Sequence, residues 1–152
     1  MNYDRLITGR TVAQGILKLK AAAEATTRAE HGHHSCEITL PLPPRECHPN
    51  TSGIHWARKA KAKKSQRETA WAIAFHVRGN FEQPIIAATF YGKTSHKKDR
   101  DNSIASLKSA IDGLVDAGLF ADDSLVRWGE IEFDKDAANP RVVLRIVEMK
   151  SK

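Results

Sequence analysis

The sequence predicts a single α+β domain, in which a mixed β-sheet is backed by helices. The expected elements follow one another as strand, helix, strand, helix, strand and strand, an order typical of a sheet with helices packed on it. A length of 152 residues favours one domain, and 41% hydrophobic residues are enough for a core. The formal net charge of +6 suits a polyanionic partner.

Residues 1–35 are expected to form an N-terminal leader that precedes the main domain over residues 36–152. Thr11 can cap a leader helix that continues to about residue 28, and an AAAEA run favours helix. Three apolar side chains share one face of this helix: Val12, Ile16 and Leu19. The leader could pack on the body, aid dimerisation or do neither, and the sequence leaves these alternatives open.

The composition excludes several classes of protein. No apolar run approaches the roughly 20 residues of a membrane span, and the N-terminus lacks the apolar core of a signal peptide. Cys36 and Cys47 are the only cysteines, so no disulfide framework is predicted. We therefore expect a cytoplasmic protein without a membrane partner.

Residues 36–41 are predicted to form the first strand, because Ile38 and Leu40 alternate with polar residues and prolines end the pattern. The surrounding segment leaves a zinc site open as an alternative. Its spacings do not follow those of structural zinc sites, which favours a polar linker that enters the strand. The residues concerned are His31, His33, His34, Cys36, Cys47 and His48.

A helix is predicted over residues 57–77, after a loop over residues 45–56 that contains turn signals. The second half of this helix offers a core face made of Ala70, Trp71, Ala74 and Phe75. His55 and Trp56 stand at its start and could stack on an exposed base, although Trp56 fits a core position equally well.

The first half of the same helix is basic around its whole circumference. A helix turn of this kind is expected to project toward phosphate groups, and a merely solvated surface is the alternative. The basic residues are Arg58, Lys59, Lys61, Lys63, Lys64 and Arg67.

Three further strands are predicted. Residues 84–92 are rich in isoleucine, threonine and aromatic residues, and the basic stretch 93–98 follows them directly. Residues 125–134 and 141–149 are expected to pair as an antiparallel hairpin, because the intervening DKDAANP supplies a turn. The second of these two is apolar enough to be a central strand.

A helix over residues 101–118 carries the most informative pattern in the chain. Asp101 or Asn102 can act as its N-cap, and Gly118 suits the left-handed conformation at its end. Its core stripe consists of Ile104, Leu107, Ile111, Leu114 and Val115. Lys108 falls roughly 40° from Ile104 at about 100° per residue, beside that stripe and on the edge that Asp101 shares.

Acidic pairs flank this helix and predict a metal site. Asp99 and Asp101 point to the same side if the segment is extended, and Asp122 and Asp123 follow the helix. Carboxylates on such a segment, with water and phosphate oxygens completing the shell, suit Mg²⁺. The alternative is that the aspartates are only caps and turn residues.

The motifs DRDN, LKSAIDGLVDAG and DD, together with ITLPLPPRECHPNTSGIHW upstream, closely resemble the RusA-type Holliday junction resolvases of phages and prophages. The resemblance covers residues 37–149 and implies a homodimeric, Mg²⁺-dependent endonuclease that nicks four-way DNA junctions. It places the metal on Asp99, Asp101 and Asp123 and an important lysine at Lys108. The interval from Asp101 to Lys108 is longer than in the best-known bacterial member.

We therefore predict a Mg²⁺-dependent endodeoxyribonuclease, with Mn²⁺ as a possible substitute, that resolves Holliday junctions by paired nicks. Two alternatives stay open: a non-catalytic basic DNA-binding module, and a related metal-dependent nuclease that acts on other branched DNA or on RNA. The residues expected to contact DNA are Arg45, Asn50, His55, Arg58, Lys59, Lys61, Lys63, Lys64, Lys97 and Lys98.

Overall fold

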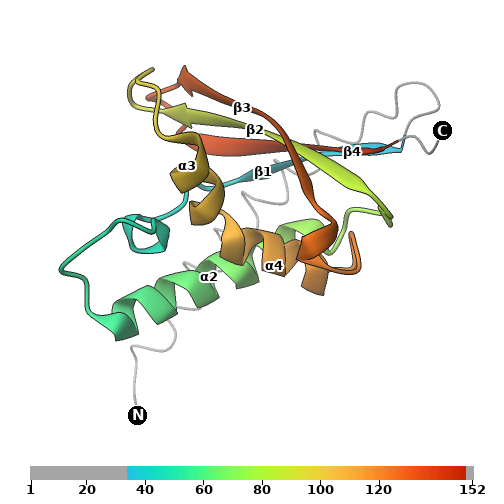
Figure 1. The fold of residues 1–152 in the computed structure, drawn as a ribbon, viewed down its shortest axis with the longest axis horizontal. Coiled ribbons are helices and arrows are strands. Elements are labelled where there is room, and N and C mark those ends of the chain that lie inside the picture. The colour runs from blue at the N-terminus through green and yellow to red at the C-terminus, as the bar shows by residue number, and fades with distance from the viewer. Residues whose placement is uncertain (1–33, 150–152) are drawn as a thin grey trace, which may run out of the picture.

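A mixed four-stranded sheet and the helices packed on one of its faces make up residues 34–149, the part of the chain that the computed structural model describes (Figure 1). The predicted leader helix over residues 11–28 lies outside this part. The elements are β1 (Ser35–Leu40), the 3₁₀ turn η1 (Arg45–Cys47), α2 (Trp56–Ala74), β2 (Pro84–Gly92), α3 (Arg100–Ser106), α4 (Lys108–Asp116), the 3₁₀ turn η2 (Asp123–Leu125), β3 (Arg127–Lys135) and β4 (Arg141–Glu148).

The sheet has the strand order β1-β4-β2-β3. β4 pairs antiparallel with β1 and with β2, whereas β3 runs parallel to β2. The central place of β4 confirms the prediction from its apolar sequence, and Val142, Leu144 and Ile146 are fully buried on its inner face. The predicted α+β class and mixed sheet are therefore both observed.

The predicted hairpin between the last two strands is wrong, because β2 lies between β3 and β4. The connection between these strands crosses the end of β2, where the backbone amide of Asp136 donates to the carbonyl of Gly92 at 2.9 Å. The arrangement has a physical reason. The polar strand β3 (RWGEIEFDK) suits an exposed edge, while the apolar strands β2 and β4 are buried between neighbours.

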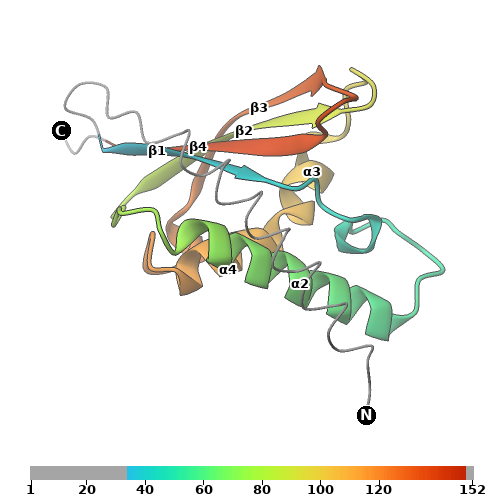
Figure 2. The same ribbon diagram turned by 180° about the vertical axis from the view of Figure 1, so that it is seen from behind.

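Helices α2 and α4 pack closely together under the sheet, as both views of the ribbon show (Figures 1 and 2). At their contact, a Cβ added to Gly113 would lie 2.3 Å from the carbonyl oxygen of Arg67. Only glycine therefore permits this approach. Leu107 and Leu114 are fully buried beside the contact and join the helices to the core of the sheet.

The predicted core face of α2 is only half right. Ala70 and Ala74 are buried, and Ile73 lies with them, but Trp71 and Phe75 are exposed. The small residues permit the close approach to α4, since the Cβ of Ala70 would stand 2.9 Å from a Cβ at Gly113. The bulky aromatic rings are consequently turned to the outside of the helix.

The helix predicted over residues 101–118 is divided into α3 and α4 at Leu107, which has φ −90° and ψ −3°. Its N-cap is Asp99, not Asp101 or Asn102: the Oδ1 atom of Asp99 accepts from the backbone amide of Asn102 at 2.8 Å. The end is as predicted, because Gly118 follows α4 with a φ of +83°. The break changes the relation between Asp101 and Lys108, which now lie on different helices.

Candidate functional site

Lys108 holds two carboxylates that come from different elements. Its Nζ atom donates to Oδ1 of Asp112 at 2.7 Å, one turn further along α4, and to Oδ2 of Asp123 at the start of η2. The structure thus brings together two of the four predicted catalytic residues, Lys108 and Asp123. A position beside the core stripe predicts partial burial of Lys108, but its side chain is 60% exposed.

The two carboxylates keep the Lys108 ammonium charged. The hydrogen bond to Asp112 is the largest cause, and with the hydrogen bond to Asp123 it raises the pKa of Lys108 above its ordinary value. A permanently charged ammonium can neutralise a carboxylate or stabilise charge on a phosphate. The spacing of four residues on one helix already predicts the contact between Lys108 and Asp112, which is an ordinary pairing on a helix surface.

The members of the second acidic pair have different surroundings. Asp122 is the N-cap of η2, where its Oδ1 atom accepts from the backbone amide of Ser124 at 2.8 Å. Hydrogen bonds from Ser124 lower the pKa of Asp122. Asp123 instead directs its carboxylate to Lys108. Asp122 therefore stabilises the turn, and Asp123 is the member that is available to a site.

The first acidic pair lies at the start of α3 and repeats this division. Asp99 uses one carboxylate oxygen to cap the helix. The side chain of Asp101 is 91% exposed, and its nearest cation is Arg100, at 3.7 Å. Because α3 separates this pair from Lys108, the first pair and the Lys108 cluster occupy opposite ends of one short helix.

The donor atoms at these positions fit Mg²⁺ in chemical type. Mg²⁺ is usually bound by one or two carboxylates and completes its shell with water and phosphate oxygens. Asp101 is accessible and Asp99 keeps one oxygen outside its cap bond, so both could serve as ligands. Within residues 34–149, no three His, Cys, Asp or Glu side chains lie close enough to hold one ion, and Asp123 is engaged by Lys108.

A cleft of about 440 Å³ joins Lys108 to the basic helix. Lys63 from α2 lines this cleft together with Lys108 and Asp112 from α4. The η1 segment closes another side with Cys47 and Pro49. Residues that the sequence assigned separately to DNA binding and to catalysis therefore line one concave surface.

The basic half of α2 divides into anchored and unpaired cations. Arg58 pairs with Glu46 at 2.8 Å, the Nζ atom of Lys59 donates to the carbonyl of Thr51 at 2.8 Å, and Lys64 lies 3.9 Å from Glu68. Lys61 and Lys63 are exposed and form no ion pair with another described residue. These two lysines are the best placed to meet phosphate.

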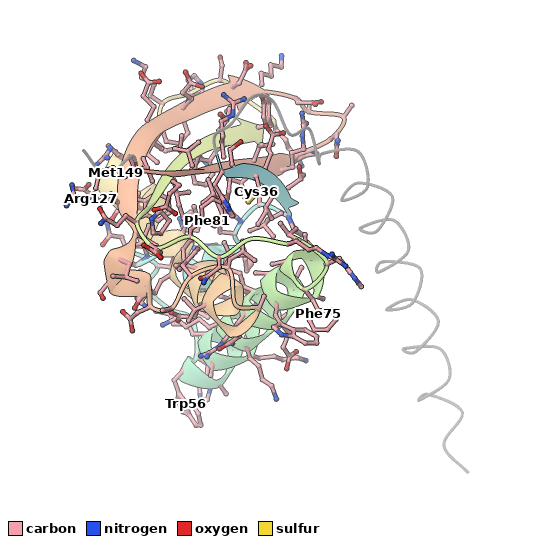
Figure 3. The ribbon with its side chains drawn as sticks, turned by 90° about the vertical axis from the view of Figure 1, so that its right-hand side faces the viewer. Cys36, Trp56, Phe75, Phe81, Arg127 and Met149 are labelled. Carbon is pink, nitrogen blue, oxygen red and sulfur yellow. The ribbon has the colours of Figure 1, made fainter. Side chains whose placement is uncertain are left out.

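The start of α2 carries an exposed aromatic side chain. His55 caps the helix, since its Nδ1 atom accepts from the backbone amide of Ala57 at 3.2 Å. Trp56 is 74% exposed at the tip of α2 (Figure 3), so the alternative that it belongs to the core is wrong. Its ring centroid lies 5.6 Å from that of His55.

The remaining predicted DNA contacts lie on exposed connections. Arg45 and Asn50 belong to the segment between β1 and α2, and Lys97 and Lys98 to the segment between β2 and α3. Burial, followed by the positive charge of Lys98, lowers the pKa of His48, which lies in the first of these connections.

The zinc alternative gains nothing from the described residues. Burial raises the pKa of the Cys36 thiol to about 12, and burial likewise raises the pKa of Cys47. Zinc binds the thiolate form, which such burial disfavours. His31 and His33 lie outside the described residues, and no three potential ligands come together inside them.

Comparison with known proteins does not assign a family or a function to the chain. No family model matches the chain. An uncharacterized protein of Xylella fastidiosa (strain Temecula1) is 34% identical over 89 residues, which cover 53% of this chain and 56% of the relative. The chain thus spans little more than half the length of the relative that it matches, and the resemblance to the RusA-type resolvases stays a prediction. Between residues 34 and 149, no helix combines the length and apolar character needed to cross a bilayer.

Proposed function

We propose that this protein is a Mg²⁺-dependent endodeoxyribonuclease that resolves four-way DNA junctions by paired nicks. The observation that carries the proposal is the cleft shared by Lys63, Lys108 and Asp112, with Asp123 in contact with Lys108. A cation-lined approach that leads to a lysine held by carboxylates is what phosphodiester chemistry needs.

DNA binding is assigned to exposed cations on α2 and on the connection before α3, of which Lys63 lines the cleft. Lys61 and Lys63 contact phosphates from α2, and Lys97 and Lys98 do so from the connection before α3. Phosphate contacts of this kind fix the position of the duplex arms without reading their sequence. Trp56, exposed at the tip of α2, stacks on a base that is exposed at the branch point.

The chemical step is assigned to the two acidic pairs and Lys108. Mg²⁺ would be held by Asp99 and Asp101 at the start of α3, and Asp123 would join them only after leaving Lys108, since the three carboxylates do not meet among the described residues. When bound, the metal would lower the pKa of a water and neutralise charge on the scissile phosphate. The Lys108 ammonium stabilises the negative charge that develops on the phosphate or orients the carboxylate of Asp123. Asp112 restrains Lys108 from the other side.

The proposed assembly is a homodimer. A four-way junction has approximate twofold symmetry, and a dimer with one twofold axis presents two identical sites to it. Paired nicks in strands of like polarity then follow from the symmetry of the enzyme, without a second kind of site.

A non-catalytic DNA-binding module is the second candidate, and one observation favours it. Asp99 and Asp122 both serve as backbone caps, as the cap-and-turn alternative expects. The two candidates differ in the products formed from an end-labelled four-way junction with Mg²⁺, with Mn²⁺ and with a chelator. Metal-dependent nicking supports the enzyme, whereas binding without nicking supports the module. Preferred cleavage of DNA flaps or RNA would show that the substrate is another nucleic acid and not the four-way junction.

A further inference from the structure

A cavity of about 540 Å³ lies between α2 and the segment that joins β1 to η1. The η1 turn lies beside the N-terminal half of α2 in both ribbon views (Figures 1 and 2). The volume falls within the roughly 300–1,000 Å³ that is typical of pockets for small ligands. The cavity shares no lining residue with the cleft that holds Lys108, and the proposed chemistry makes no use of it.

Most of the cavity surface is apolar. The buried side chains of Leu40, Leu107 and Ala110 contribute to it, and Pro41 and Pro44 add two rigid rings. An apolar lining with a few polar groups favours a ligand that has an apolar body and polar groups at its edge. The polar groups of the lining therefore indicate which ligand fits.

One polar group in this lining lacks a partner. The Nε2 atom of Gln66 donates to the carbonyl of Ser106 at 2.9 Å, which fixes that end of the amide as the donor. The Oε1 atom of Gln66 is buried and has no hydrogen-bond partner among the described residues. Buried acceptors without a partner are rare, because they lose their bond to water. A ligand that brings an N–H group to this oxygen is therefore favoured.

The rim of the cavity carries one unpaired positive charge. Arg58 and Glu46 both line the cavity and neutralise each other at 2.8 Å. Lys61 also lines it, is exposed and forms no ion pair with another described residue. An anionic group on the ligand would meet the Lys61 ammonium.

We propose that the cavity binds one nucleobase of the DNA substrate, with Lys61 on an adjoining phosphate. A nucleobase has apolar faces, N–H groups on its edge and a linked phosphate, which match the apolar walls, Gln66 and Lys61 in turn. Adenine and cytosine present an exocyclic amine that can donate to the Gln66 oxygen. This site rests on the proposed function and deepens it, because it adds a contact to a base to the contacts with phosphate.

The cavity adjoins the cleft of the proposed chemistry through one hydrogen bond. Gln66 lines the cavity, and Ser106, which accepts from it, lines the cleft. A strand whose base occupies the cavity is therefore held beside Lys108, which follows Ser106 by two residues. Removing a base from a regular duplex costs unstacking and unpairing energy, so a branch point, where stacking is interrupted, favours such binding.

The test follows 2-aminopurine, a fluorescent base with an exocyclic amine, placed at the branch point of a four-way junction. The wild-type chain is compared in chelator with Ala62→Phe, which fills the cavity, and with Ala60→Phe, which adds the same ring to α2 outside the lining. The emission is expected to rise about twofold or more with the wild-type chain and with Ala60→Phe, because the base leaves its stack. Ala62→Phe should bind the junction through phosphate contacts and give no rise.

An equal rise with all three chains would overturn the proposal, because the base would then be unstacked at another place. Binding of the wild-type chain without any rise would overturn it as well. A change of molar mass in solution caused by Ala62→Phe would make the cavity an interface between two copies of the chain, and this result also contradicts a base as the occupant.

Free nucleotides give a second readout on the wild-type chain, which does not depend on the folding of a variant. Deoxyadenosine monophosphate should shift the NMR signal of the Ala62 methyl group, whereas inorganic phosphate should not. The analogue without the exocyclic amine should bind about tenfold more weakly, because the Gln66 oxygen is left without a donor. Gln66→Met should remove this difference. Equal effects of nucleotide and inorganic phosphate would contradict a base site.

The two proposals fail in different ways. A cavity-dependent rise in emission without nicking in Mg²⁺ would support the base site and contradict the nuclease. Nicking in Mg²⁺ without such a rise would support the nuclease and contradict the base site.

Discussion

The two acidic pairs that flank α3 and α4 have the same internal plan and different surroundings. In each pair the side-chain carboxylate of the first aspartate, Asp99 or Asp122, caps a helix or turn by accepting from a backbone amide. The second, Asp101 or Asp123, is free of that duty. Asp101 projects into solvent beside Arg100, whereas Asp123 is held by Lys108. In each pair one carboxylate is a cap and the other is not, and the two second members differ in exposure and in the contact with Lys108.

The largest expected effect separates the proposed metal ligands from Asp122. Asp101→Asn should reduce nicking of a four-way junction by about a hundredfold or more, because a ligand charge is lost while the fold is kept. Junction binding should persist or strengthen, since phosphate repulsion falls. Asp123→Asn should behave alike, and Asp122→Asn should be milder. A reversed ranking of Asp122 and Asp123 would assign the wrong member of that pair to the site.

Asp99 has two proposed roles, as the cap of α3 and as a metal ligand, and two substitutions separate them. Asp99→Ala should lose both nicking and about 1 kcal/mol of unfolding free energy, because the cap of α3 disappears. Asp99→Asn keeps a good cap and loses only the charge. Urea unfolding and junction cleavage of both variants give the separation. Equal stability of the two proteins would show that the cap contributes little.

Variants of Lys108 test its contact with Asp123, which the first acidic pair lacks. Lys108→Ala should lower the nicking rate by about a hundredfold with little change in junction affinity, because its charge acts on the transition state. Lys108→Arg should rescue poorly, since a planar guanidinium does not replace a compact ammonium. Stability should change by only roughly a few tenths of a kcal/mol, as for other exposed i,i+4 pairs. Asp112→Asn is the matched variant and should have an intermediate rate. Full activity of Lys108→Ala would remove the lysine from the mechanism.

The basic half of α2 lies across the cleft from Lys108, and substitutions in it should change DNA affinity more than the nicking rate. Changing Lys59, Lys61, Lys63 and Lys64 together to alanine should weaken binding to all DNA forms. Each lost phosphate contact should reduce the slope of log K against log salt by about 0.9 on duplex arms. The double variant of Lys61 and Lys63 should account for most of this change, because Lys59 and Lys64 already have partners in the protein. An unchanged slope would make the helix a solvated surface.

The smallest expected effect concerns a carboxylate that has no part in the proposed site. The Arg67 guanidinium binds Asp116 and lowers the pKa of that carboxyl below its ordinary value of 3.8. A lowered folded-state pKa means that the stabilisation is complete above the unfolded pKa and is lost as the pH falls through the folded value. Asp116→Asn should therefore lower the melting temperature slightly at neutral pH, and the difference should begin to shrink as the pH falls below about 3.8 and vanish only below the lowered folded-state pKa. A difference that persists in acid would point to lost packing between α2 and α4.

Local patterns predicted the elements well and their pairing poorly. The apolar run of β2 and the centre of the sheet at β4 could be predicted, because both depend on nearby residues. The position of β2 between β3 and β4 could not, since strand order depends on pairing over long distances in the chain. The exposed Trp71 and Phe75 were misplaced for a similar reason: the close approach of α2 to Gly113 selects alanines for the contact.

At the site, short-range geometry was again the predictable part. The spacing from Lys108 to Asp112 gives their contact, and the position of Gly118 gives the end of α4. The break at Leu107 and the cap at Asp99 were missed, because a core leucine gives no local signal for a break and three polar residues compete for the cap. The contact from Lys108 to Asp123 depends on the path of the chain after Gly118, which a motif alone does not fix. Metal, junction and dimer remain proposals.

The most direct measurement of the central proposal is cleavage of an end-labelled four-way junction by the purified wild-type chain, with and without Mg²⁺. Binding is followed in parallel on the same DNA. The proposal predicts Mg²⁺-dependent nicks at symmetric positions in two strands of like polarity, and their loss in Asp101→Asn with binding retained. Tight junction binding without any nick in Mg²⁺ or Mn²⁺ would contradict it and leave a DNA-binding module whose aspartates serve only as caps.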